Sequence, residues 1–124
     1  MEIRKALAED CAQILALLQQ VRVKGISHIT GGGFYENIPR SIPDGLGVTI
    51  REDDVRVLPI FRLIQSAGQV NTHDMFNTFN MGVGMCVVVA PEDVETALST
   101  LKENGEDAYL LGEIGEAKEK VTLC

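Results

Sequence analysis

The spacing of apolar residues predicts helices that alternate with strands along the whole chain. Over residues 5–20, apolar side chains recur every three or four positions, which is the pattern of an amphipathic helix. The apolar face of this helix would carry Leu7, Cys11, Ile14, Leu15 and Leu18. Further helices are predicted at 34–42, at 59–68, at 73–79 and from Pro91 to a stop at Asn104-Gly105.

Signals at the ends of the predicted helices support these assignments. Pro59 and Pro91 suit a first helical turn, because the N–H that proline lacks has no intrahelical partner there. Gly68 suits a C-terminal stop, and Asn71-Thr72 offers an N-terminal cap for the helix that follows.

Five strands are predicted between these helices, at 25–30, 47–51, 83–90, 108–114 and 121–123. The run Val83–Ala90 is apolar on both faces, which predicts a strand in the middle of a covered sheet. No linker or internal repeat divides the chain, so residues 1–124 are expected to form a single domain. The predicted class is α+β, with a mixed β-sheet covered by helices.

Charge, apolar run length and cysteine spacing disfavour several classes of function. The formal net charge of −7 disfavours nucleic-acid binding, because an acidic surface repels phosphate backbones. No apolar run is long enough to span a membrane, and the charged N-terminus does not resemble a signal peptide. The three cysteines are scattered, which argues against a disulfide framework. We therefore expect a cytoplasmic protein with no membrane or nucleic-acid partner.

The first candidate site is a run of three glycines, Gly31, Gly32 and Gly33, between a predicted strand and a predicted helix. Such a loop lets a ligand approach the backbone, and its N–H groups can bind an anion. Thr30 can add a hydroxyl donor, and Asn37 and Arg40 follow at a spacing that could place both on one side. His28 shares a strand face with Thr30. The alternative is a tight structural turn with a helix cap, beside a structural histidine.

The second candidate site is the stretch Asn77–Met85, in which Asn80, Gly82 and Gly84 could line a cleft or pack closely. It lacks the full GxGxxG pattern and leads from helix to strand, which disfavours a Rossmann-type dinucleotide site. The alternative is a polar loop at the start of a strand. Acidic residues fall at predicted turns and helix ends, so no metal ligand is predicted.

Four stretches carry a family resemblance: KGISHITGGGFYENIPR, VLPIFRLIQ, MFNTFNMGVGM and GEDAYLLGEI. In this order they resemble the C-terminal part of phosphoribosylformylglycinamidine cyclo-ligase, also called aminoimidazole ribonucleotide synthetase. The resemblance covers about residues 20–124. It implies a truncated C-terminal domain of that type, without the N-terminal ATP-binding domain. The first twenty residues depart from the family pattern.

The resemblance also implies a reaction of purine biosynthesis. In this ligase family ATP activates the formyl oxygen of formylglycinamidine ribonucleotide, and a nitrogen then displaces phosphate to close the imidazole ring. The active site lies between two domains, and the N-terminal domain supplies most groups that hold ATP and Mg²⁺. By motif, His28 is the implied catalytic residue. The implied substrate- or phosphate-binding residues are Thr30, Gly31, Gly32, Gly33, Asn37 and Arg40, and the implied cleft-lining residues are Asn80, Gly82 and Gly84.

Three hypotheses follow for the chain by itself. It could be a part of the cyclo-ligase that is inactive without the N-terminal domain, with no tightly bound cofactor of its own. It could be a free-standing module that binds a phosphate or nucleotide or assists assembly, or a folded remnant without function. A sheet cut at its edge leaves unpaired backbone groups, so we also expect a homo-oligomer such as a homodimer, with exchange of the N-terminal helix.

Overall fold

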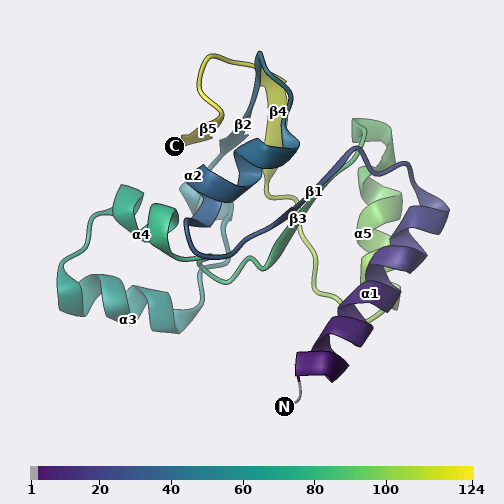
Figure 1. Ribbon diagram of the computed structural model, residues 1–124, viewed down its shortest axis with the longest axis horizontal. Helices are drawn as coiled ribbons and strands as arrows, with labels where there is room; N and C mark the ends of the chain where they lie inside the picture. The colour runs from purple at the N-terminus through teal and green to yellow at the C-terminus, as the bar shows by residue number, and fades with distance from the viewer. Residues whose placement is uncertain (1–2) are drawn as a thin grey trace. The chain divides into compact units, whose positions relative to one another are not determined.

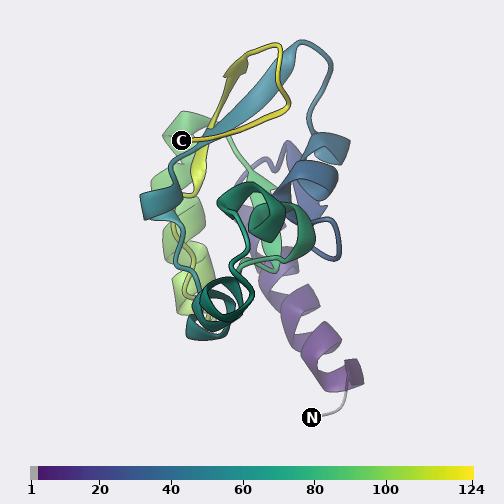
Figure 2. The ribbon, with the colours of Figure 1, turned by 90° about the vertical axis from the view of Figure 1, so that its left-hand side faces the viewer.

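The computed structural model describes the backbone of residues 3–124 and the side chains from Cys11 onward (Figures 1 and 2). The helices and strands, in chain order, are α1 (Ile3–Gln20), β1 (Gly25–His28), α2 (Gly33–Asn37), β2 (Leu46–Ile50), α3 (Pro59–Gly68), α4 (Thr72–Thr78), β3 (Met85–Val88), α5 (Val94–Glu103), β4 (Gly112–Glu116) and β5 (Val121–Leu123). Short 3-10 helices lie at Ile38–Ser41 (η1), Glu52–Asp54 (η2) and Pro91–Asp93 (η3). No helix among residues 3–124 has the length and apolarity needed to cross a membrane.

The chain divides into two compact units. The first consists of Met1–Lys24 and Val87–Leu110, and the second of Gly25–Cys86 and Leu111–Cys124. Both candidate stretches lie in the second unit. The expectation that residues 1–124 form a single domain stays a prediction.

In the first unit, α1 and α5 lie side by side (Figure 1). Their shared core is formed by Leu17, Val21 and Ala97, with Val23, Val87, Val89 and Leu101 packed against it.

The predicted apolar face of α1 is wrong in part, because Cys11, Leu15 and Leu18 are exposed. Of the other two residues in that prediction, Ile14 is half-buried and Leu7 lies outside the described side chains. The helix carries apolar residues on two stripes, and α5 covers the one that contains Leu17.

The second unit contains a three-stranded mixed sheet in the order β4-β2-β5. Strand β2 runs antiparallel to β4, with Val48 opposite Ile114, and parallel to β5, with Val48 opposite Val121. Val48, Ile50 and Val121 are buried and form the apolar side of this sheet. The predicted α+β class with a mixed sheet is therefore confirmed, although β4 begins later than the predicted 108–114.

Strands β1 and β3 form a separate two-stranded sheet. The predicted central strand at 83–90 is thus wrong in its placement, since β3 has only β1 as a neighbour among the described strands. Its first residue, Met85, is 41% exposed. An apolar run reports that a segment avoids water, but it does not specify which strands will pair with it.

Helices α2 and α4 contribute buried aromatic side chains to the core of the second unit. The rings of Phe34 and Phe76 lie 5.2 Å apart, and both side chains are almost fully buried. The single helix predicted at 34–42 is replaced by α2 and the 3-10 helix η1, which begins one residue before Pro39. Proline cannot donate the backbone hydrogen bond that would continue an α-helix, which explains the change. Helices α3 and α4 form at or within one residue of the predicted bounds.

Candidate functional site

The glycine run forms the loop between β1 and α2, and its three glycines have different surroundings. Gly32 and Gly33 have positive φ angles of 97° and 59°. A Cβ on Gly33 would lie 2.0 Å from the carbonyl oxygen of Phe76 and 2.7 Å from that of Phe79. A Cβ on Gly31 would meet nothing within 4 Å. The loop is therefore packed against α4 at Gly33 and open at Gly31.

The side chain of Asn37 holds this loop in place. Its Nδ2 donates to the carbonyl oxygens of Gly33 at 2.8 Å and of Thr30 and Gly31 at 3.3 Å each. Its Oδ1 accepts a long hydrogen bond of 3.4 Å from the Thr30 hydroxyl. Asn37 is only 3% exposed, so this buried amide fixes the shape of the loop from within.

The loop leaves some groups free for a ligand. The N–H of Gly33 donates to the Thr30 carbonyl at 3.0 Å, whereas those of Gly31 and Gly32 find no acceptor among the described residues. Arg40 is exposed, in η1, and forms no ion pair within the described part of the chain. Because Asn37 is buried and Arg40 is exposed, the two do not share a surface as their spacing suggested. Anion binding by this segment stays a prediction.

His28 lies on the exposed face of β1. Its neighbours Ser27 and Ile29 point inward and are buried, while His28 and Thr30 are both exposed. Thr30 lies beyond the end of β1, and its hydroxyl donates to the buried Asn37 side chain, so a face shared by His28 and Thr30 stays a prediction. A catalytic role for His28 stays a prediction.

In the second stretch, Met81 is buried and Gly82 is closely packed, whereas a Cβ on Gly84 would meet nothing within 4 Å. The Oδ1 of Asn80 accepts from the N–H of Gly82 at 2.9 Å, and this turn gives Met81 a φ of 57° and Gly82 a φ of 101°. A Cβ on Gly82 would lie 2.7 Å from Cγ of Leu58. The carbonyl oxygen of Gly84 accepts from the N–H of Ile29 at 2.9 Å, which joins this stretch to β1.

The two stretches meet at one open cleft of about 270 Å³. Its lining residues are Thr30, Gly31, Phe61, Thr78, Phe79 and Asn80. The rings of Phe61 and Phe79 lie 5.5 Å apart and give the cleft an apolar side. Neither Gly82 nor Gly84 contributes to the lining. A larger hollow, of about 530 Å³, lies in the other unit among polar residues of α1 and α5 and contains none of the motif residues.

Glu36 is the residue at this loop that the sequence analysis did not single out. Its carboxylate folds back over the glycine run, so that a Cβ on Gly32 would lie 2.1 Å from its Oε2. The stretch HITGGGFYENIPR contains it, but a glutamate on a short helix usually points to solvent, so spacing alone gave no reason to choose it.

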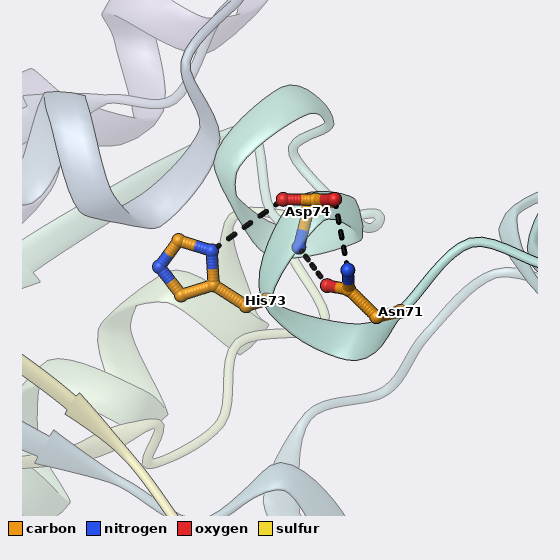
Figure 3. A network of polar contacts seen from close by, with 3 residues as sticks. All are labelled: Asn71, His73 and Asp74. Atoms are coloured by element: carbon orange, nitrogen blue, oxygen red, sulfur yellow. Dashed lines mark hydrogen bonds and ion pairs between the residues drawn. The ribbon is translucent and has the colours of Figure 1, made fainter.

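A polar network caps α4 on the side that faces α2 (Figure 3). The Oδ1 of Asn71 accepts from the N–H of Asp74 at 2.8 Å, which confirms the predicted cap. Nδ1 of His73 lies 3.7 Å from the Asp74 carboxylate. The imidazole also stacks on the Tyr35 ring at 4.4 Å, and partial burial raises the pKa of Tyr35 above its usual value.

Residues 3–124 match one protein family, described as AIR synthase related protein, C-terminal domain. Two curated relatives are each named phosphoribosylformylglycinamidine cyclo-ligase. The protein from Lachnospira eligens is 49% identical over 104 residues, which make up 84% of this chain and 30% of that protein. The protein from Caldicellulosiruptor saccharolyticus is 47% identical over 110 residues, or 89% of this chain and 32% of that protein.

The fold is also similar to a crystal structure of HypE from E. coli, a hydrogenase maturation protein. The TM-score is 0.70 at 26% identity, over 90% of this chain and 34% of that chain. The chain thus spans about a third of the length of the curated relatives it matches. These similarities confirm the resemblance noted in the sequence and the fold of a C-terminal domain.

Proposed function

Because this chain belongs to the family of AIR synthase related protein C-terminal domains, we propose that it acts as the C-terminal part of a phosphoribosylformylglycinamidine cyclo-ligase. Such a ligase closes the imidazole ring in purine biosynthesis. The chain would contribute one side of the substrate site. The substrate would be formylglycinamidine ribonucleotide.

The meeting of the two motif stretches at one cleft supports this proposal best. Thr30 and Gly31 come from the first stretch, and Thr78, Phe79 and Asn80 come from the second, about fifty positions later in the chain. Gly31 lines this cleft, and a Cβ on it would meet nothing within 4 Å, so a ligand could approach its backbone there. The cleft is open, as expected for a site completed by a further domain.

We assign the phosphate of the substrate to the free N–H group of Gly31 and to the Arg40 guanidinium. Backbone N–H groups and arginine both favour phosphate oxygens, and arginine can donate to two of them at once. Thr30 and Asn80 would orient the substrate in the cleft. His28, which is exposed at the end of β1, would polarise the reacting amide or carry a proton.

Among the described residues, no group of three or more His, Cys, Asp or Glu side chains could hold a metal ion. We therefore assign ATP and Mg²⁺ mainly to the part of the ligase that corresponds to the remaining two thirds of the relatives. ATP would supply the phosphoryl group that activates the formyl oxygen, and the chain by itself would not turn over. We also propose that the protein is cytoplasmic and forms a homodimer.

Calorimetric titration of the chain with formylglycinamidine ribonucleotide at low salt tests this function. We expect binding that weakens at least about tenfold in Arg40→Ala, which removes charge-assisted bonds to phosphate. Arg22→Ala is the matched control, since Arg22 is also exposed but lies outside the unit that contains the cleft. Unchanged affinity in Arg40→Ala would contradict the phosphate assignment. Ring closure by the chain alone would contradict the need for a further domain.

A further inference from the structure

The carboxylate of Glu36 lies beside Gly32, within the same loop whose Gly31 lines the cleft. Its Oε2 would come within 2.1 Å of a Cβ on Gly32, and its own N–H donates to the Gly32 carbonyl at 3.3 Å. Gly31, the next residue back, lines the cleft. A negative charge thus lies against the loop that presents the free N–H groups.

The Glu36 carboxylate has no bonding partner in the described part of the chain. It forms no ion pair and no hydrogen bond there, although Arg40 follows four positions later. The side chain is exposed, so holding it in this position brings no gain from burial. An uncommitted carboxylate beside Gly32, in the loop whose Gly31 lines the cleft, is suited to a ligand that carries positive charge.

The inference drawn from this rests on the function proposed above: we propose that Glu36 recognises the positively charged amidine of the substrate. A protonated amidine is a planar cation with N–H donors on two nitrogens, like part of a guanidinium. A carboxylate can accept two parallel hydrogen bonds from such a group, which gives both energy and orientation. Glu36 would then position the amidine beside Gly32, while the phosphate binds the Gly31 N–H group and the Arg40 guanidinium.

This role predicts discrimination between two otherwise identical ligands. Formylglycinamide ribonucleotide has an amide where the substrate has the amidine, so it keeps the phosphate, the ribose and the formyl group but carries no cation. A site that pairs a carboxylate with the cation should reject the neutral analogue, because the carboxylate then loses its partner. A site that binds only phosphate would not distinguish the two.

The test is calorimetric titration of the whole chain with both ligands. We expect the wild-type protein to bind the amidine at least about tenfold more tightly than the amide, the ratio that one charge-assisted pair supplies. Glu36→Gln should weaken amidine binding by about the same factor and leave amide binding unchanged. Glu113→Gln, on the exposed part of β4, is the matched control and should behave as wild type.

The outcomes separate this inference from the proposed function. Equal wild-type affinity for the two ligands, or a Glu36→Gln protein that keeps the preference for the amidine, overturns the role of Glu36 and leaves the substrate site in place. If neither ligand binds, the result contradicts the substrate site itself and, with it, the role of Glu36. The wild-type comparison needs no variant, and a thermal melt shows whether Glu36→Gln is folded.

Discussion

The two loops at the cleft are both rich in glycine, but their glycines have different roles. In the first loop, Asn37 fixes the backbone from inside and Gly31 stays open to the cleft. In the second, Leu58 closes the space beside Gly82, and the Gly84 carbonyl pairs with β1. These contacts hold both loops, but only the first presents an unhindered glycine at the cleft. The presence of glycine therefore does not by itself identify a ligand contact; Gly31 differs from the others in these loops because it both has open space and lines the cleft.

The largest effect is expected from Gly33→Ala in the first loop. The new Cβ would lie 2.0 Å from the Phe76 carbonyl oxygen, and the φ of 59° is unfavourable for alanine. Since a backbone group of α4 would have to move, we expect the free energy of unfolding to fall by at least about 3 kcal/mol. Urea unfolding followed by circular dichroism measures this.

Gly31→Ala is the control within the same loop. Its Cβ would point into open space, so stability should change by no more than about 0.5 kcal/mol. Equal destabilisation by the two substitutions would show that Gly31 is as closely packed as Gly33, and the contrast within the loop would be lost.

The next largest effect is expected from Asn37→Ala. This change removes the buried amide that donates to the carbonyls of Thr30, Gly31 and Gly33, so stability should fall by about 2 kcal/mol. Hydrogen exchange at the loop amides should accelerate as well. Asn37→Asp keeps the size but not the donors, so it should behave like Asn37→Ala. A stable loop in Asn37→Asp would mean that size, rather than donation, holds the backbone.

A smaller effect is expected from Gly82→Ala in the second loop. The backbone φ of 101° is strained for alanine, but the obstacle is the Leu58 side chain, which is 50% exposed and can rotate away. We expect a loss of about 1 kcal/mol. In the double variant with Leu58→Ala the loss should be less than the sum of the single losses, because the two side chains compete for one space. Strict additivity would argue that Leu58 does not limit Gly82.

At mildly alkaline pH the smallest effect is expected from two titrating side chains, Tyr35 in α2 and Cys86 in β3. Burial raises the pKa of the Cys86 thiol from 9.0 to about 12, and that of Tyr35 above 10.0. The folded state holds both protons more tightly, so this stability is complete below pH 9 and declines as pH rises toward 12. At pH 9.5 the loss through Cys86 should be under about 1 kcal/mol. Unfolding of Cys86→Ala across this range should show a shallower decline, and an identical decline would contradict the burial of the thiol.

Local signals in the sequence predicted several elements well. Pro59 and Gly68 bound α3, and the Asn71 side chain caps α4, because proline geometry and side-chain capping act within a few residues. Such effects need no knowledge of the rest of the fold.

Predictions that depend on partners were less successful. The stripe on α1 that includes Leu15 is exposed, since α5 covers the other stripe, and the strand predicted at 83–90 pairs only with β1 among the described strands. Asn37 was predicted to face a ligand, but a spacing rule cannot show that its amide turns inward to the loop. For the same reason no spacing rule indicates how Glu36 lies against Gly32. These features depend on contacts between segments, which periodicity does not encode.

The most direct test of the account is to follow backbone amide resonances of the ¹⁵N-labelled chain during titration with formylglycinamidine ribonucleotide. If the two loops form one substrate site, the amides of Gly31 and Gly32 should shift together with that of Asn80, and both sets should give one dissociation constant. Residues of α5, in the other unit, should not shift. Shifts in only one loop, or two different dissociation constants, would contradict a single site built from both motifs.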